Sequence, residues 1–463
     1  MDKRNRSAEK TESRYAMMIQ ESIPKLIAKL SVPTILSMLI SSIYNLVDTA
    51  FVGQLGTSQS AAIGVVFGFM AIIQAVGFLF GQGAGSISAR MLGGRDEEGA
   101  TRVASSGIVC SFGLGVVIAV TVALLKDPIV RILGSTETIA PYAKEYLNYI
   151  LLAAPAMTCS YTMNNLLRYE GRASLGMVGM MVGAILNIAL DPLLMFVLDL
   201  GIAGAAIATA SSQMISFLIL ISMYRRGKTA IHVSLRKADF RLKTIGNIVA
   251  TGTPSLLRQV LNSLATILLN SSAAPYGDEA VAAMSIVSRV SFFVFALALG
   301  IGQGFQPVSA FNYGAGKYAR LRKAFQVTVI MAEGILVVMA GVGLALSGQL
   351  IGLFRDDPKV IEIGTRALQL QFVTLVFLPF TMAVEMLYQS TGHRIGAALM
   401  SAARSGLFFI PSLLILSSLR GLAGIQEAQP LAYVLSFPLA LFYCIRFWRK
   451  TPAEDQKDEE SDD

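Results

Sequence analysis

Charged residues are scarce in this chain. Only 15% of its 463 residues are Asp, Glu, Lys or Arg, and 54% are hydrophobic, whereas a soluble domain carries roughly 25% charged residues. A soluble fold of this composition would lack the charge that keeps its surface solvated. The charges gather in short patches between apolar runs of 20 or more residues, long enough to cross a hydrocarbon core about 30 Å thick as helices. The sequence therefore predicts a polytopic membrane protein and excludes soluble enzymes and nucleic-acid-binding proteins.

Cysteine and histidine are also rare. The three cysteines, Cys110, Cys159 and Cys444, lie in different apolar runs and lack the spacing of a disulfide framework or a metal site. We expect them to be small core side chains. Two histidines, His232 and His393, are too few for a histidine-built metal site. No signal peptide is recognisable, because about 24 mostly polar residues precede the first apolar run and no cleavage motif follows it.

Twelve apolar runs predict twelve transmembrane helices, since an open strand would leave backbone groups unpaired in lipid. The basic residues set the orientation: with the N-terminus inside, the inner segments hold 28 of the 38 Lys and Arg residues and the outer connections hold five. We therefore expect a protein of the cell membrane with both termini in the cytoplasm. The runs lie near 26–52, 60–88, 103–125, 140–160, 174–198, 201–224, 245–273, 280–308, 323–347, 361–389, 395–419 and 429–448.

These runs divide the chain into two sets of six. We expect a cytoplasmic N-terminal segment over residues 1–24, an N-lobe over 25–224 and a C-lobe over 245–449. The basic stretch 225–244 is predicted to be the cytoplasmic linker, in contact with anionic lipid headgroups. The acidic end of the chain, residues 450–463, is predicted to be a disordered tail.

The chain also contains an internal repeat. When it is shifted by 221 residues against itself, residues 33–93 give fourteen identities, among them Gly81-Gln82-Gly83 with Gly302-Gln303-Gly304. A unit of six spans enters the membrane facing the same way in both copies, so the repeats are parallel. We expect two lobes around a central cleft that opens to alternate sides, which suits a carrier better than a channel or an enzyme.

A cluster of oxygen-bearing residues in the first half is the candidate ion site, because polar groups inside spans are costly and mark function. Asn187 and Asp191 are spaced i,i+4 and so leave the same helix face. Asp48 lies in the first span, and Thr209 with the Ala205 carbonyl in the sixth. Such oxygens suit a hard cation such as Na⁺. Two carboxylates in apolar surroundings also resist double ionisation, so the same cluster suits a proton.

Structural interpretations of these residues stay open at this point. Asp191 precedes Pro192 and could cap a helix break, and Asp48 could lie at a polar outer end of its helix. Pro33 and Pro254 occupy equivalent positions in the repeat and are predicted to kink the first helix of each lobe, as a static bend or as a hinge.

The second half does not duplicate the acidic cluster, since Leu269 stands at the position equivalent to Asp48. Several of its span charges are expected to pair with one another and fix packing. Glu385 is the candidate contact for a cationic substrate, and the other residues expected to line the substrate cavity are Met382, Tyr44, Asn164 and Gln303. The charged residues of these spans are Arg258, Arg289, Glu333, Arg366, Glu385 and Arg404.

The chain resembles the multidrug and toxic compound extrusion (MATE) transporters from about Leu30 to Phe447. The resemblance implies twelve helices in two lobes, export by antiport, and cationic amphipathic compounds as common substrates. It also places the N-lobe cation site of the bacterial branch on Asp48, Asn187, Asp191 and Thr209 with the Ala205 carbonyl. The motifs that carry it are Asn45-Leu46-Val47-Asp48, Asn165-Leu166-Leu167-Arg168, Asn187-Ile188-Ala189-Leu190-Asp191-Pro192, Gly304-Phe305-Gln306-Pro307 and Asn312-Tyr313-Gly314-Ala315.

One branch of that family carries a glutamate on its seventh helix, where this sequence has Arg258, Gln259 and Asn262 instead. A second coupling site in the C-lobe is therefore not expected.

We accordingly expect a secondary antiporter that exchanges H⁺ or Na⁺ for amphipathic organic cations, monomeric in the lipid bilayer. No cofactor besides the coupling ion, no nucleic-acid partner and no enzymatic activity are expected. The alternative is a flippase for lipid-linked saccharides. An intramembrane aspartyl protease would need a Gly-x-Gly-Asp context, which Asp48 and Asp191 both lack.

Overall fold

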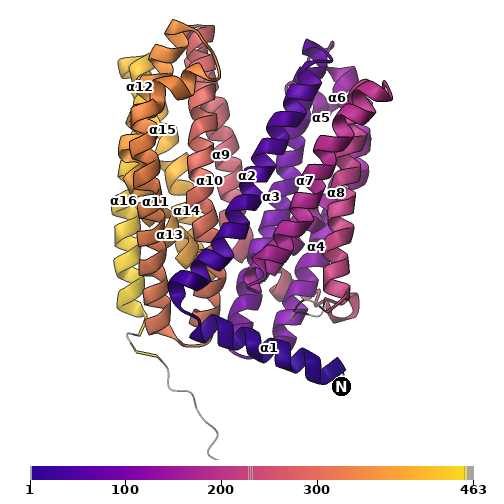
Figure 1. Ribbon diagram of the computed structural model, residues 1–463, viewed down its shortest axis with the longest axis vertical. Coiled ribbons are helices and arrows are strands. Elements are labelled where there is room, and N and C mark those ends of the chain that lie inside the picture. The colour runs from indigo at the N-terminus through magenta and orange to yellow at the C-terminus, as the bar shows by residue number, and fades with distance from the viewer. Residues whose placement is uncertain (1–2, 228, 230, 232, 453, 456–463) are drawn as a thin grey trace, which may run out of the picture. The chain divides into compact units, whose positions relative to one another are not determined.

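In the computed structural model, residues 3–227, 229, 231, 233–452 and 454–455 are described, and in these ranges the regular secondary structure is entirely helical (Figure 1). His232 and, in the predicted tail, residues 453 and 456–463 lie outside the described residues. The helices of the first half are α1 Lys3–Gln20, α2 Ile23–Gly53, α3 Thr57–Gly93, α4 Glu97–Leu124, α5 Lys126–Ile132, α6 Ala140–Tyr169, α7 Ala173–Pro192 and α8 Gly201–Arg225.

The second half repeats the pattern with more interruptions. Its helices are α9 Leu242–Ala273, α10 Asp278–Gly314, α11 Tyr318–Gly352, α12 Pro358–Thr374, α13 Leu378–Ser390, α14 Arg394–Ala402, α15 Phe409–Arg420 and α16 Leu422–Lys450. A 3₁₀ turn at Leu375–Phe377 joins α12 to α13, and a π-helical turn at Ala403–Leu407 joins α14 to α15. Each of these joined pairs forms one membrane-length segment.

Every one of the twelve predicted spans is occupied by a helical segment. Ten of the described segments are long and apolar enough to cross a membrane. The other two, α6 and α9, have 30 and 32 residues and are as long as their neighbours, but they are richer in polar side chains. The short helices α1 and α5 were not among the predicted spans.

Local chemistry sets the ends of several helices. Asp96 precedes α4 and its Oδ1 accepts a hydrogen bond from the Gly99 backbone N–H at 2.8 Å, which satisfies one of the free N–H groups of the first turn. Gly56 and Gly277, equivalent in the repeat, precede α3 and α10 with φ of 136° and 97°, a conformation that favours glycine. Both halves therefore make the same turn between their first two helices.

The chain forms two compact units. Unit 1 comprises residues 1–15 and 36–252, and unit 2 comprises residues 16–35 and 253–463. The first helix of each half is thus divided: α2 changes unit after Ile35 and α9 after Gly252, each within two residues of Pro33 or Pro254. The lobe boundaries expected from the sequence, 25–224 and 245–449, place each of these helices wholly in one lobe and stay a prediction.

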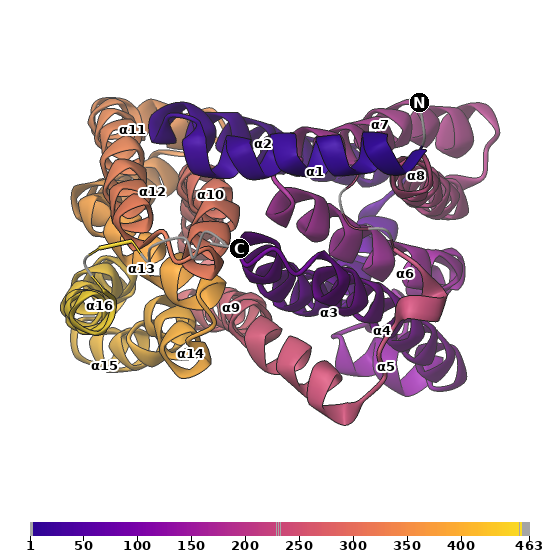
Figure 2. The ribbon, with the colours of Figure 1, turned by 90° about the horizontal axis from the view of Figure 1, so that it is seen from below.

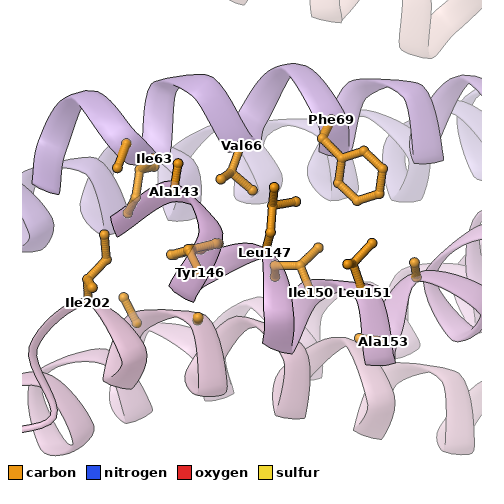
Figure 3. Packing of buried hydrophobic residues seen from close by; sticks show 14 of the residues in the cluster. Ile63, Val66, Phe69, Ala143, Tyr146, Leu147, Ile150, Leu151, Ala153 and Ile202 are labelled. Carbon is orange, nitrogen blue, oxygen red and sulfur yellow. The ribbon is translucent and has the colours of Figure 1, made fainter. Parts of the chain in front are cut away.

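The core of unit 1 surrounds α6. Ile63, Val66 and Phe69 of α3 pack against Tyr146 and Leu147 of α6, as Figure 3 shows. Viewed from below, α3, α4 and α6 lie together (Figure 2). The buried position of α6 brings the Tyr146 hydroxyl to hydrogen-bonding distance of Thr209 on α8, one of the residues predicted to bind an ion.

Small residues allow two further helix pairs to approach closely. A Cβ on Gly252 would lie 1.8 Å from the Leu79 carbonyl oxygen, and one on Gly83 would lie 2.1 Å from that of Ile248, both within unit 1. In unit 2 a Cβ on Gly304 would lie 2.1 Å from Ser31 Oγ. The repeated Gly-Gln-Gly segment is therefore a site of close helix packing in each unit.

Three polar segments outside the predicted spans are held by hydrogen bonds or an ion pair to the helices. In α1, the Arg14 guanidinium forms a buried ion pair with Glu170 at 3.2 Å within unit 1. In the linker, the Ser234 backbone N–H donates to Ser105 Oγ of α4 at 3.1 Å. In the segment predicted to be a disordered tail, Asp455 Oδ1 accepts from the Ala319 N–H at 2.8 Å, in the first turn of α11.

Candidate functional site

The two predicted carboxylates lie together inside unit 1. Asp48 projects from α2 and Asp191 from the last turn of α7, and their side chains are hydrogen-bonded to each other. Asp48 is 1% exposed and Asp191 is 0% exposed. Two carboxyl groups this close together and this far from water resist simultaneous ionisation, because each charge loses its hydration and repels the other.

Asn187 and Thr209 complete the predicted cluster. The Asn187 amide Nδ2 donates to Asp191 Oδ1 and to Thr209 Oγ1, each at 3.2 Å. Both residues are buried. Pro192 ends α7 and a π-helical turn follows at Leu193–Val197, a combination that interrupts the regular helix at the carboxylate.

Tyr146 of α6 was not predicted to belong to the site. Its hydroxyl lies 3.2 Å from Thr209 Oγ1 and it is fully buried. The only sequence signal was a tyrosine within an apolar run, because the contact joins residues 63 positions apart. Ala205, whose carbonyl was expected to contribute, is fully buried in α8 one turn before Thr209.

Several oxygen atoms of the cluster have no hydrogen-bond donor. They are Asp48 Oδ1, Asn187 Oδ1 and Asp191 Oδ2, and all three are buried. An acceptor buried without a donor is costly, and three such oxygens fit the ligand preference of a small hard cation. Within the described chain, no basic side chain forms an ion pair with Asp48 or Asp191. A negative charge on this cluster would therefore have no basic side chain of the described chain to balance it.

A small cavity lies next to this cluster in unit 1. Its volume is about 70 Å³, and its lining includes the predicted residues Tyr44 and Asn164. Tyr44 lies one helical turn before Asp48 on α2 and hydrogen-bonds to Gln213 of α8. Two of the five residues expected to line a substrate cavity thus lie beside the carboxylate pair.

The other three predicted cavity residues lie in unit 2. Glu385 is buried and forms an ion pair with Arg258, and its Oε1 accepts from Ser401 Oγ at 2.6 Å. The expectation that some span charges pair with one another is confirmed at this position. Arg258 compensates the charge of Glu385 in this structure, and contact of Glu385 with a cationic substrate stays a prediction.

Met382 and Gln303 are likewise buried side chains. Met382 Cγ lies 3.5 Å from the position that a Cβ on Gly302 would occupy, so Met382 of α13 packs against α10. Unit 2 also contains a cavity of about 300 Å³, and neither residue lines it. The two predicted hinge prolines stand inside α2 and α9, next to the positions where these helices pass from one unit to the other.

Comparison with protein families gives a match in both halves. The MatE family model matches residues 33–193 and 254–415, together well over half of the chain. The two matches begin 221 residues apart, which is the offset of the internal repeat.

Characterised relatives match most of the chain. The multidrug export protein MepA of Staphylococcus haemolyticus (strain JCSC1435) is 30% identical over 424 residues, which are 91% of this chain and 93% of that protein. MepA of Staphylococcus aureus (strain MSSA476) is 30% identical over 397 residues, 85% of this chain and 87% of that protein.

Solved structures share the fold. A MATE protein in complex with MaL6 matches with a TM-score of 0.88 and 27% identity, over 94% of this chain and 98% of that one. An outward-facing multidrug resistance MATE family transporter of the MOP superfamily gives the same values. These matches and the helices above confirm an all-α membrane protein with twelve transmembrane helices in two repeats. The chain is therefore a member of the MATE family of membrane transporters.

Proposed function

We propose that this chain exports amphipathic organic compounds, above all cations, from the cell in exchange for inward movement of H⁺ or Na⁺. Relatives at 30% identity that carry the name multidrug export protein support export of such compounds. The observation that carries the coupling is the buried Asp48–Asp191 pair, which has no basic partner among the described residues.

The physical basis of the coupling is charge compensation. A doubly ionised pair in a buried site is strongly disfavoured, because each carboxylate loses its hydration and repels the other. Binding one cation removes that cost, and releasing it restores the cost. A conformation that keeps the site buried is therefore favoured when the cation is bound, and one that hydrates the site is favoured when it is not.

The roles within the site follow from its contacts. Asp48 and Asp191 bind the coupling cation. Asn187 and Thr209 orient Asp191 and offer the amide and hydroxyl oxygens that a sodium ion would use, together with the Ala205 carbonyl. Pro33 and Pro254 are the positions at which α2 and α9 bend as the cycle proceeds.

Vesicle transport tests this proposal. The purified chain in liposomes is given a pH gradient alone or a sodium gradient alone, and movement of a fluorescent amphipathic cation is followed. The wild-type protein should move the dye under at least one gradient, and Asp48→Asn should reduce that movement to the rate of empty liposomes. Asp356→Asn is the matched control, because Asp356 is exposed and lies far along the chain from the site.

Two results would contradict the proposal. Gradient-driven transport by folded Asp48→Asn protein at the wild-type rate would remove the pair from the mechanism. Movement of a lipid-linked saccharide without movement of dye cations would favour a flippase instead.

A further inference from the structure

The C-terminal half contains a larger cavity that the proposed antiport mechanism does not use. This cavity, called the unit 2 cavity below, has a volume of about 300 Å³ and lies entirely within unit 2. That volume is at the lower end of the range for small-molecule sites. Its lining mixes amides, hydroxyls and aromatic rings, and the residues used below are Asn262, Phe292, Phe295, Arg404, Ser405 and Tyr433.

The unit 2 cavity and the small cavity of unit 1 occupy equivalent places in the repeat. Six residues that line the small cavity have a partner exactly one repeat, 221 residues, further on that lines the larger one. The duplicated fold is thus hollowed at the same place in both halves. The pairs are Ser41 with Asn262, Tyr44 with Ala265, Asn45 with Thr266, Gln74 with Phe295, Gly183 with Arg404, and Ala184 with Ser405.

The sign of the charge differs between the two places. Asp48, the carboxylate beside the small cavity, is replaced by Leu269, which lines the larger one. Where the first half has Gly183, the second has Arg404. The small cavity thus adjoins an anionic pair, whereas the larger cavity has a guanidinium in its wall.

Arg404 is held by contacts that leave its charge uncompensated. Its guanidinium carbon lies 4.1 Å from the centroid of the Phe295 ring, and the side chain hydrogen-bonds to Tyr433. No described carboxylate forms an ion pair with it, and Glu385, the nearest candidate, is paired with Arg258. The charges of Arg404, Arg258 and Glu385 sum to +1, so the unit 2 cavity has a net positive charge.

The backbone at Arg404 is not regular α-helix. Arg404 and Ser405 lie in the π-helical turn Ala403–Leu407, and Phe408 N–H closes it on the Ala403 carbonyl at 3.0 Å. Such turns are rare inside α-helices and are frequent at functional sites. Ser405 Oγ donates to Asn262 Oδ1 at 2.5 Å, which leaves the Asn262 amide N–H groups as donors beside the cavity.

We propose that the unit 2 cavity binds the carboxylate group of amphipathic organic anions and zwitterions, with Arg404 as the recognition residue. This inference extends the substrate range of the proposed exporter and rests on that function. An arginine fork matches a planar carboxylate and can form two parallel hydrogen bonds with it. The rings of Phe292 and Phe295 offer apolar surface to the body of the ligand. A simple halide would use neither the fork nor the rings.

Direct binding to the purified full-length protein tests this proposal. The probes are two fluorescent dyes with one skeleton, a rhodamine with a free carboxyl group and its ethyl ester, and affinity is measured by fluorescence polarisation without any ion gradient. Arg404→Gln should weaken binding of the carboxyl dye by about 10- to 100-fold, as expected for loss of a charge-assisted hydrogen-bonded pair. Binding of the ester should stay within about twofold of wild type, since the ester has no carboxylate for Arg404 to bind.

Matched controls separate recognition from folding. Arg289→Gln removes an exposed arginine from α10 and should change neither affinity. Arg404→Lys keeps the charge without the fork and should give an intermediate loss. On the wild-type protein alone, benzoate should displace the carboxyl dye, whereas benzamide and chloride at the same concentration should not.

Equal loss of both dyes in folded Arg404→Gln protein, or no loss of either, would overturn the proposal. Displacement by chloride as effective as by benzoate would also overturn it and identify an inorganic anion site. Because no gradient is applied, failure of the antiport proposal would leave these binding results unchanged, so the two failures are distinguishable.

Discussion

At the scale of single residues, the chain places its charges in two different ways. Asp48 and Asp191 share a hydrogen bond and lack a basic partner in the described structure, whereas Arg258 and Glu385 neutralise each other. Both pairs are buried. The Asp48–Asp191 pair can bind or release a cation at a low cost in free energy. The Arg258–Glu385 pair contributes to the stability of the fold.

The Arg258–Glu385 pair gives a stability prediction. Glu385→Gln leaves the Arg258 guanidinium buried without its counter-charge, and breaking a buried pair in this way costs about 3–5 kcal/mol. We expect the single variants Glu385→Gln and Arg258→Gln to unfold at lower temperature than wild type in thermal denaturation of the purified protein. The double variant should be more stable than either single variant. Single variants as stable as wild type would show that the pair contributes nothing.

Thr209 gives a prediction about the coupling ion. Thr209→Val keeps the shape of the side chain and removes the hydroxyl that accepts from Asn187 Nδ2. We expect the ion concentration for half-maximal dye transport to rise roughly tenfold, because a buried Asn187 N–H loses its acceptor. Thr209→Ser, which keeps the hydroxyl, should stay near wild type. An unchanged ion dependence in Thr209→Val would exclude this residue from the site.

The limits of sequence analysis show at the same scale. The i,i+4 spacing of Asn187 and Asp191 and the rarity of charge in spans were enough to predict the acidic cluster. Tyr146 and the choice of Arg258 as partner of Glu385 were not predictable, because these contacts join residues 63 and 127 positions apart. Composition shows that a charge is buried but not which distant charge compensates it.

At the scale of elements, hydropathy predicted the spans but not their interruptions. The turns at Leu375–Phe377 and Ala403–Leu407 divide two predicted spans, yet no hydrophilic residue run marks either place. The contacts of α1 with the rest of unit 1 were not predicted either, because the ion pairs Arg14–Glu170 and Glu12–Arg95 join residues far apart in the chain.

Close packing of α9 against α3 gives a prediction for this scale. Gly252→Ala would bring a Cβ to 1.8 Å from the Leu79 carbonyl oxygen, so the backbones must separate. Overpacking of this kind costs about 1–3 kcal/mol, and we expect a lower unfolding temperature. Gly246→Ala on the same helix is the control, because nothing lies within 4 Å of its Cβ position, and it should be neutral or slightly stabilising. Equal stability of the two variants would contradict the packing described above.

At the scale of the whole molecule, the repeat explains both the fold and the division of function. Two copies of one six-helix unit keep the same turns, such as those at Gly56 and Gly277, and the same cavities. Only the first copy retains the acidic pair, and only the second carries Arg404. Under the two proposals above, the first copy binds the coupling ion and the second recognises anionic groups.

The orientation in the membrane remains a prediction from the basic residues, and cysteine labelling tests it. In a variant with the three native cysteines replaced by alanine, Thr136→Cys and Arg236→Cys are introduced one at a time at exposed positions. A charged, membrane-impermeant thiol reagent added to intact cells should label position 136 and leave position 236 unlabelled. The reverse pattern would place both termini outside.

Ion counterflow tests the central claim most directly. If occupancy of the Asp48–Asp191 pair couples the two fluxes, the coupling must be reciprocal at equilibrium. Vesicles with equal pH and equal sodium on both sides are loaded with dye, and the ions are followed with a trapped pH indicator and with radioactive sodium. The account predicts that dye leaving wild-type vesicles draws protons or sodium inward, and that Asp48→Asn abolishes this ion movement. Dye efflux without any ion movement in wild type, or the same ion movement in Asp48→Asn, would contradict it.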